Sequence, residues 1–559
     1  MKSCVCKSYH IIFLLSMAGV LALLITSCSH AYSETAQDVL YEVKYIRDGF
    51  ENIEYAYFFN KTYSEYAPYI EEIYVYVPEP IMLLPDELTF ENVLTLTNER
   101  RQVVHVPNMK RIQSWINARD PIILDGTNLF NSTRASSLSK EEAIYDMEML
   151  FRLLRHMYAA YHYFGGDEIF LPMQEAMLEE IALQERWSYN QLAQLVQNNL
   201  GEVIIDNHFI INGYSGSTFN NPHHTFIWNT PFDRSERGFR ERETGLYVAY
   251  VEGYDVNTLF RLTVNEAGEF YYAPVIFRRT AEGIYYTLHI TFENGEHRAI
   301  NLVRTIHNRA HANGASSSLR FVNNIPIVSI RRMGDSFNPY THRHQEALQV
   351  LAYAEALRNE PVFILDIRSN EGGASSFSYQ WLYKLMGEVV PPNFNWLGFF
   401  DAYIHVPEGI RRPERWYVGF GSRAGFDFEY PPELFGHYLH MTPIANNIFF
   451  TPEEAQDRVI ANDQFIIILI DRFTLSSGET FADQFTNIEN TLIIGQNTMG
   501  MLLTSSGLPL YLPHSGMPVS MGRHMLVHPD DGWEEGIGIS PDVWVVGDAL
   551  TAALAMLYP

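Results

Sequence analysis

Apolar runs and amphipathic stretches alternate in the C-terminal part of the chain. IPIVSIRRM (325–333), PVFILDI (361–367) and QFIIILI (464–470) have the length and β-branched content of buried strands. Between the first two lies HRHQEALQVLAYAEALRN (342–359), whose apolar residues recur at helical spacing. This alternation predicts right-handed βαβ crossovers and a largely parallel sheet.

Two other patterns precede this region. Residues 139–200 have apolar positions at helical spacing and a start at Ser139 that resembles a capping box. The stretch VIIDNHFIING (203–213) predicts a strand interrupted by a polar triplet. Residues 215–320 alternate apolar and polar positions, and Asn294-Gly295 predicts a hairpin turn. We therefore expect a helical region that ends in a strand, followed by a separate β-rich domain.

The chain of 559 residues is too long for a single core, and two or three domains are expected. The changes of pattern divide it into a signal peptide (1–27), an N-terminal α/β region of unknown role (28–137), a helical region ending in the DNHF strand (138–212), a β-rich domain (213–322) and an α/β core (323–559).

A short basic region opens the chain and leads into an apolar stretch that ends at Cys28, which is the layout of a secretory signal. The sequence ITSC at its end resembles a bacterial lipobox, in which the cysteine becomes the lipidated first residue. A membrane-anchoring helix is the alternative. Cys4 and Cys6 would leave with the signal, so the mature chain could form neither a disulfide nor a cysteine metal site. We expect an exported lipoprotein, held by Cys28 on the periplasmic side of a bacterial membrane or on the cell surface.

The composition adds a constraint on partners. Hydrophobic residues make up 47% of the chain and aromatic residues 14%, which favours a well-packed globular protein. The formal net charge is -27, so the protein would repel nucleic acids and anionic lipid surfaces. We expect no nucleic-acid partner.

A pair of serines lies where the apolar run 464–470 gives way to a helical pattern. Ser476 and Ser477 follow Asp471-Arg472-Phe473 at this strand-to-helix corner. Backbone N–H groups at a helix start have no partner within the helix, so a nucleophile there would lie beside oxyanion donors. Serine is also a leading N-cap residue, and the corner alone favours a plain cap over a nucleophile.

Three further features contain polar groups that could take part in catalysis or ligand binding. His208 lies between two apolar half-strands, where a histidine is either a core or edge residue or a catalytic base. Gly372 and Gly373 follow the strand 361–367 and allow either a tight turn or a close approach of backbone amides to a ligand. Glu535 lies among glycines in an acidic loop near the C-terminus, which is ordinarily a solvated turn.

The sequence gives no positive sign of a metal or cofactor. His223-His224 and the pair His307 and His311 lack a neighbouring carboxylate pattern or an HExxH motif, so we interpret them as solvated loop histidines. The segment 419–424 (GFGSRA) has glycines at dinucleotide-binding spacing, but no helix follows it. The aromatic-rich stretch 393–430 suits either a lid or substrate wall or packing against a neighbouring domain. We expect no metal and no cofactor.

Four motifs, in order, resemble those of the serine peptidase family that includes the C-terminal-processing peptidases and the tricorn core peptidase. DNHF (206–209) resembles the family's D-G-H-T, and ILDIRSNEGG (364–373) resembles L-D-L-R-x-N-x-G-G. TLSSGE (474–479) resembles T-A-S-A-x-E, and EGIGISPDV (535–543) resembles the ending G-x-G-V-x-P-D. PHSGM (513–517) also resembles a segment of tricorn-like members. The resemblance implies a crotonase/ClpP-like α/β core.

The resemblance also implies roles for individual residues. Ser476 would be the nucleophile, and the amide of Ser477 with that of Gly372 or Gly373 would form the oxyanion hole. Processing peptidases use a lysine that follows a glycine after the serine helix, but here Met501 follows Gly500, and Lys384 is the last lysine. The tricorn-like branch uses histidine and glutamate instead. His208 would then be the general base, and Glu535 would orient its imidazole.

These inferences favour an exported serine peptidase that acts on peptides or proteins through an acyl-enzyme. The chain departs from the family at Asn207 and Phe209, where glycine and threonine are usual, and it has no clear PDZ signature. The alternative is a catalytically inactive lipoprotein of the same fold that binds a peptide or an apolar ligand.

Overall fold

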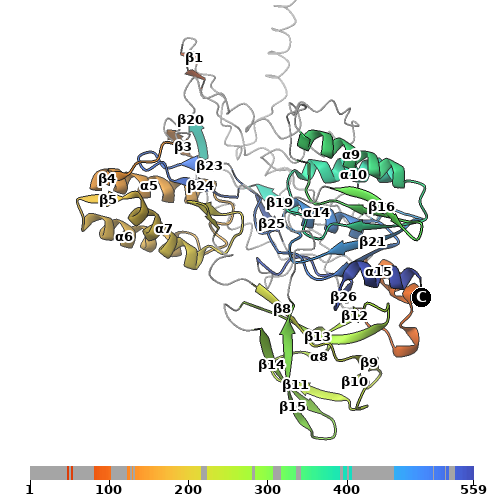
Figure 1. Ribbon diagram of the computed structural model, residues 1–559. Coiled ribbons are helices and arrows are strands. Elements are labelled where there is room, and N and C mark those ends of the chain that lie inside the picture. The colour runs from red at the N-terminus through yellow and green to blue at the C-terminus, as the bar shows by residue number, and fades with distance from the viewer. Residues whose placement is uncertain are drawn as a thin grey trace, which may run out of the picture.

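The computed structural model describes residues 81–101, 129, 132–215, 223–279, 284–305, 317–334, 342–388, 390, 459–505, 507, 509–522, 524–527 and 535–558 (Figure 1). It also gives five short strands, β1 (Arg47–Asp48), β2 (Asn52–Ile53), β3 (Ile122–Asp125), β19 (Asn395–Gly398) and β20 (Ala402–His405). The predicted signal, Cys28, His307, His311 and most of the aromatic-rich segment 393–430 lie outside the described residues. Among the helices that are described, none is both long and apolar enough to cross a membrane.

The predicted helical region consists of three helices, α5 (Lys140–Met157), α6 (Asp167–Ala182) and α7 (Tyr189–Val203). Its capping box forms as expected, because the Ser139 hydroxyl accepts from the Glu142 amide and the Glu142 carboxylate accepts from the Ser139 amide. An antiparallel pair of short strands, β4 (Ser137–Ser139) and β5 (Arg186–Ser188), directly precedes the starts of α5 and α7.

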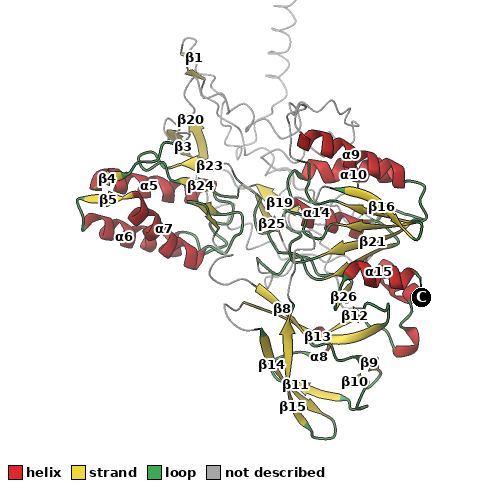
Figure 2. Ribbon diagram, viewed as in Figure 1, coloured by secondary structure: helices red, strands yellow, loops and turns green. Residues whose placement is uncertain are grey.

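Strands from far along the chain complete this helical lobe. The strands β23 (Pro509–Tyr511) and β24 (Pro518–Ser520) form a small sheet with β6 (Ile210–Ile211) and β7 (Tyr214–Ser215). Their apolar side chains share one buried cluster with the three helices. Residues near the C-terminus are therefore part of the lobe that carries the DNHF motif (Figure 2).

The strand predicted for residues 203–213 is largely wrong. Helix α7 continues to Val203, residues 204–209 are irregular with a turn at Asn207-His208, and only Ile210–Ile211 pair as a strand. The polar triplet bends the chain because its groups bond outside any sheet. The Asp206 carboxylate, for example, accepts from the backbone amide of His208 at 2.9 Å.

The predicted parallel core is confirmed. Its parallel strands are β17 (Ile325–Ser329), β18 (Val362–Asp366), β21 (Phe465–Ile470), β22 (Thr491–Gly495) and β26 (Val543–Val545). Antiparallel β16 (Ser318–Val322) forms one edge of this sheet.

Helices cover both faces of the core sheet (Figure 1). The helices α9 (His342–Leu357), α10 (Ser375–Met386) and α14 (Ser477–Gln484) pack on one face, where the apolar cluster includes Ile466 and Ile468. The helices α3 (Phe90–Arg101) and α15 (Ala549–Leu557) pack on the other, with Ile467 and Leu469. The alternation of these side chains follows the two-residue period of a strand. The chain is thus a mixed α/β protein, as expected.

The β-rich region has the predicted strands, among them β11 (Val248–Val251), β12 (Phe260–Val264), β13 (Phe270–Arg279), β14 (Tyr285–Phe292) and β15 (His297–Arg304). It also contains β8 (His223–Ile227), β9 (Phe232–Ser235), β10 (Gly238–Glu241) and the short helix α8 (Val256–Leu259). The hairpin at Asn294-Gly295 joins β14 to β15, and Gly295 has a φ of 84°.

This β-rich region is hydrogen-bonded to the core. Strand β12 pairs in parallel with β26, with Thr263 opposite Trp544 and Val264 opposite Val545. The β-rich region and the core therefore share one sheet, which holds the β-rich strands at a fixed position relative to the core.

Candidate active site

Ser476 lies at the corner between β21 and α14 in a conformation that L residues rarely adopt. Its φ is 53° and its ψ is -121°. Its backbone amide donates to the Glu479 carboxylate at 2.8 Å, whereas its hydroxyl forms no cap hydrogen bond to the helix. The hydroxyl is therefore directed to another partner, and an unusual backbone conformation at such a corner is one mark of a functional site.

That partner is the imidazole of His208. The Nε2 atom of His208 lies 3.1 Å from the Oγ atom of Ser476, within hydrogen-bonding distance. His208 comes from the loop between α7 and β6 in the helical lobe, and Ser476 comes from the core. The fold thus brings together two predicted site residues that are 268 positions apart.

The His208 side chain is buried next to a network centred on Asp206. One Asp206 oxygen accepts from the His208 amide, and the other accepts from the Tyr158 hydroxyl at 2.7 Å and the Thr504 hydroxyl at 2.8 Å. Burial lowers the pKa of His208, and the Asp206 charge and the Thr504 backbone partly oppose this effect. The ring is consequently neutral at neutral pH and able to accept a proton.

Glu535 is buried close to this network but contacts neighbours of the ring. One carboxylate oxygen accepts from the backbone and side-chain amides of Asn207, both at 3.1 Å. The other accepts from the backbone amides of Leu502 and Leu503. Among the described residues, no hydrogen bond joins Glu535 to the His208 imidazole, because these four donors occupy its oxygens. Burial and the charge of Asp206 raise the pKa of Glu535 well above its usual range.

The paired glycines lie against the serine corner. A Cβ atom on Gly372 would come within 2.9 Å of the Ser476 Cβ, so only glycine allows this approach. The Gly372 amide donates to Asn370 Oδ1 at 2.8 Å, whereas the Gly373 amide makes no hydrogen bond to any described residue. The Ser477 hydroxyl donates to the Gly373 carbonyl at 2.7 Å and holds the loop to the helix start.

Asn370 was not predicted as part of the site, although it lies within the ILDIRSNEGG motif. Its side chain is fully buried and bonds to the Ile330 carbonyl as well as to Gly372. Its own carbonyl accepts from the Leu475 amide at 3.0 Å. Asn370 therefore links the end of β17, the glycine loop and the residue before Ser476.

A buried ion-pair cluster supports the start of the same loop. Asp366 is bonded by Arg331 and by Arg368, and Arg368 also pairs with Asp548 at 2.8 Å. Burial alone would raise the pKa of Asp366, but the two guanidinium groups outweigh it and hold that pKa well below its usual range.

The position after Gly500, which resembles that of the lysine in processing peptidases, is Met501. Its backbone amide donates to Glu479 at 2.9 Å, and the amide of Gly500 donates to the same carboxylate at 2.7 Å. Glu479 thus ties this segment to the Ser476 amide. His208 is the titratable side chain that the structure places on the Ser476 hydroxyl.

The described residues contain no group of three or more His, Cys, Asp or Glu side chains arranged to hold a metal. His223 and His224, predicted to lie in a loop, are the first residues of β8, so that prediction of their backbone is corrected.

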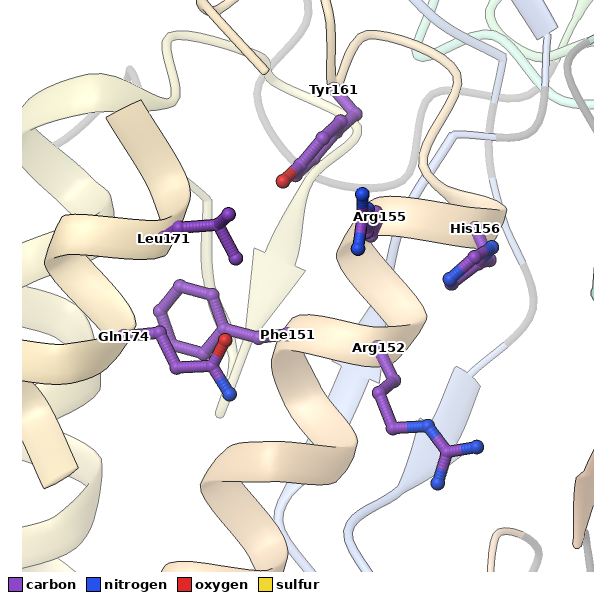
Figure 3. Close-up of a pocket in the computed structure, with 7 residues that line it drawn as sticks. All are labelled: Phe151, Arg152, Arg155, His156, Tyr161, Leu171 and Gln174. Atoms are coloured by element: carbon purple, nitrogen blue, oxygen red, sulfur yellow. The ribbon is translucent and has the colours of Figure 1, made fainter. Parts of the chain in front are cut away.

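A separate hollow of about 220 Å³ lies on the helical lobe between α5 and α6 (Figure 3). Its lining residues are Phe151, Arg152, Arg155, His156, Tyr161, Leu171 and Gln174. Arg155 is already paired with Asp167 at 2.6 Å. None of the lining residues belongs to the serine corner or to the glycine loop.

A serine hydroxyl on a strained strand-to-helix corner, in contact with a buried imidazole and beside a glycine loop, is the constellation of a serine hydrolase. Residues 439–545 match the model of peptidase family S41. The matched residues are about a fifth of the chain and include the TLSSGE and EGIGISPDV motifs, so the match supports the resemblance drawn from these two motifs.

Solved structures to which the chain is similar include mature CPAF. It is 16% identical, the match covers 72% of this chain and 92% of that chain, and the TM-score is 0.38. The photosystem II D1 C-terminal processing protease is 12% identical; the match covers 72% of this chain and 92% of that chain, with a TM-score of 0.31. The tricorn protease is 12% identical; the match covers 72% of this chain and 34% of the tricorn chain, with a TM-score of 0.28. No curated protein sequence matches the chain.

Proposed function

We propose that the protein is a serine peptidase that hydrolyses peptide bonds through an acyl-enzyme. The observation that carries this proposal is the 3.1 Å contact between His208 Nε2 and Ser476 Oγ. A serine that only capped α14 would direct its hydroxyl to the helix amides, and that of Ser476 does not.

In the proposed reaction, His208 Nε2 takes the proton of Ser476 Oγ as the oxygen attacks the substrate carbonyl. The same imidazole then protonates the leaving amine, and water later hydrolyses the ester. The lowered pKa of His208 keeps the base neutral before attack. The negative charge of Asp206 favours the imidazolium that forms during attack.

The oxyanion would be held by backbone amides at the corner. Ser477 is the first residue of α14, where the helix dipole adds positive potential. The second donor in the proposal is Gly373, because the amide of Gly372 is engaged by Asn370. Of the two glycines left open by the sequence, the hydrogen bonding thus favours Gly373.

We propose that Glu535 acts as a positioning residue. Its bonds to both amides of Asn207 fix the residue before the base, and its bonds to Leu502 and Leu503 connect that residue to the segment after α14. Its role would then be to hold the His208 loop against the core.

Export and lipidation at Cys28 remain part of the proposal. The layout of residues 1–28 and the lipobox-like ITSC support them. The substrates would then be peptides or proteins outside the cytoplasm. The net charge of -27 supports the expectation that nucleic acids are not partners.

Hydrolysis of a fluorogenic peptide mixture by the purified mature chain tests the proposal. We expect cleavage by the wild type and its loss in Ser476→Ala, with the thermal unfolding of the variant unchanged within a few degrees. Equal cleavage by both proteins would overturn the proposal.

A further inference from the structure

Two stretches of sequence at the boundary between the β-rich region and the core lack acidic residues, although the chain as a whole is strongly acidic. Residues 297–334 contain six arginines and three histidines and no Asp or Glu. Residues 207–232, which begin next to His208, also contain no Asp or Glu. Both stretches interrupt a chain that carries 66 acidic residues.

These two acid-free stretches meet at His224 and Arg304. The Nε2 atom of His224, in β8, lies 3.5 Å from the NH1 atom of Arg304, at the end of β15. Both side chains are half-buried. Within the described part of the chain, neither forms an ion pair with a carboxylate. Burial and the positive charges of Arg304 and Arg472 lower the pKa of His224, so its imidazole is neutral at neutral pH and Arg304 carries the charge of the pair.

The pair of His224 and Arg304 is connected to the serine corner by a short chain of contacts. The Thr225 hydroxyl, next to His224, donates to Asn497 at 2.6 Å. The next residue, Thr498, donates its hydroxyl to Glu479, whose carboxylate accepts from the Ser476 amide. Arg472, which lies between β21 and Ser476, bonds to the Thr498 and Met499 carbonyls.

A half-buried arginine that pairs with no carboxylate among the described residues, and that is linked by contacts to the serine corner, is suited to bind an anion. A half-buried arginine offers paired N–H donors to a carboxylate, and a neighbouring histidine can add a third donor. The negative field of the rest of the chain would otherwise repel an acidic peptide. A site with an unpaired positive charge would attract an acidic peptide locally.

We propose that His224 and Arg304 form a carboxylate-binding subsite, so that the peptidase prefers substrates with a carboxylate at one fixed distance from the scissile bond. The carboxylate belongs either to an acidic side chain or to the substrate's own C-terminus. This inference rests on the proposed peptidase function and names its substrate class.

Matched fluorogenic peptides test the subsite. One set exchanges Gln for Glu at each position in turn, and a second set compares a free C-terminal carboxylate with an amide. We expect the wild type to have a KM about tenfold lower for the carboxylate form at one position, with kcat little changed. A preference in the first set identifies a side chain, and a preference in the second identifies the chain end.

Variants then assign the preference to the residues. Arg304→Ala should abolish the discrimination between Glu and Gln or between acid and amide, and Arg304→Glu should reverse it. Arg320→Ala, which removes an exposed arginine of the same acid-free stretch on the edge strand β16, should keep the wild-type preference. A wild type without preference, or an Arg304→Ala protein that retains it, would overturn the inference.

A binding measurement tests the carboxylate subsite independently of the proposed peptidase reaction. Fluorescence anisotropy with labelled peptides on the Ser476→Ala protein measures the carboxylate preference without turnover. If the wild type cleaves no peptide but this variant still prefers carboxylates, the peptidase proposal fails and the subsite stands. If cleavage occurs and binding shows no preference that depends on Arg304, the subsite fails alone.

Discussion

The imidazole of His208 and the hydroxyl of Ser476 are 3.1 Å apart, yet they belong to different lobes of the molecule. His208 is carried by the loop after α7, and Ser476 precedes α14 of the core. The proposed base and nucleophile therefore meet only because the helical lobe is held on the core. The Glu535 bonds to Asn207 and to Leu502 are one such connection.

The first prediction concerns the acidic limb of the pH profile. Burial lowers the pKa of His208 from its ordinary value of 6.5, so the base stays neutral to a lower pH than a free histidine would. We expect kcat/KM for a neutral peptide to fall with a midpoint below 6.5. A midpoint at or above that value would contradict the assigned base.

Asp206→Asn extends this prediction. The Asp206 charge raises the pKa of His208, so its removal should move the acidic limb to still lower pH. Asp233→Asn is the matched control, because Asp233 is a buried carboxylate in the β-rich region that is paired with Arg240 and Arg242. The control should leave the midpoint unchanged, whereas a shift to higher pH in Asp206→Asn would argue against the electrostatic account.

The backbone of Ser476 gives a prediction about stability. At a φ of 53° and a ψ of -121° an alanine is strained and a glycine is not. Ser476→Gly should therefore be more stable than Ser476→Ala by about 1 kcal/mol in denaturant unfolding. At the neighbouring Ser477, inside the helix, the order of the glycine and alanine variants should reverse. An alanine variant at 476 as stable as the glycine variant would show that the corner is unstrained.

Asn370 gives a prediction that separates positioning from stability. Asn370→Ala frees the Gly372 amide and should lower kcat about 100-fold with a small change in KM, because the oxyanion loop shifts. Asn462→Ala is the control, since the Asn462 side chain also bonds backbone groups, donating to the carbonyls of Gln464 and Glu489 at the far end of β21. Both variants should lose about 1–3 kcal/mol of stability, but only the first should lose kcat. Equal kcat values would remove Asn370 from the site.

Local patterns predicted the core elements because each depends on residues close in sequence. The buried runs that became β18 and β21, the hairpin at Asn294-Gly295 and the helix after Ser476 are of this kind. The parallel pairing of β12 with β26 was not predicted, because its residues are about 280 positions apart and no local period encodes their register.

The individual residues of the candidate site could be predicted from the sequence, but the hydrogen bonds between them could not. The motifs named Ser476 and His208, and their contact was inferred from a resemblance rather than from any spacing. The partners of Glu535 could not be read from the chain, because burial and four donors decide which groups its oxygens bind. The role of Asn370 could have been predicted from its motif. An asparagine shortly before two glycines is typical of a loop in which the side-chain amide hydrogen-bonds to the loop's own backbone.

Labelling with a fluorophosphonate probe tests the central claim most directly, since the probe reacts only with an activated serine. We expect the folded wild type to be labelled, Ser476→Ala to be unlabelled and His208→Ala to be labelled at least about 100-fold more slowly. A folded wild type that the probe does not label, or labelling that persists in Ser476→Ala, would contradict the assignment of Ser476 as the nucleophile.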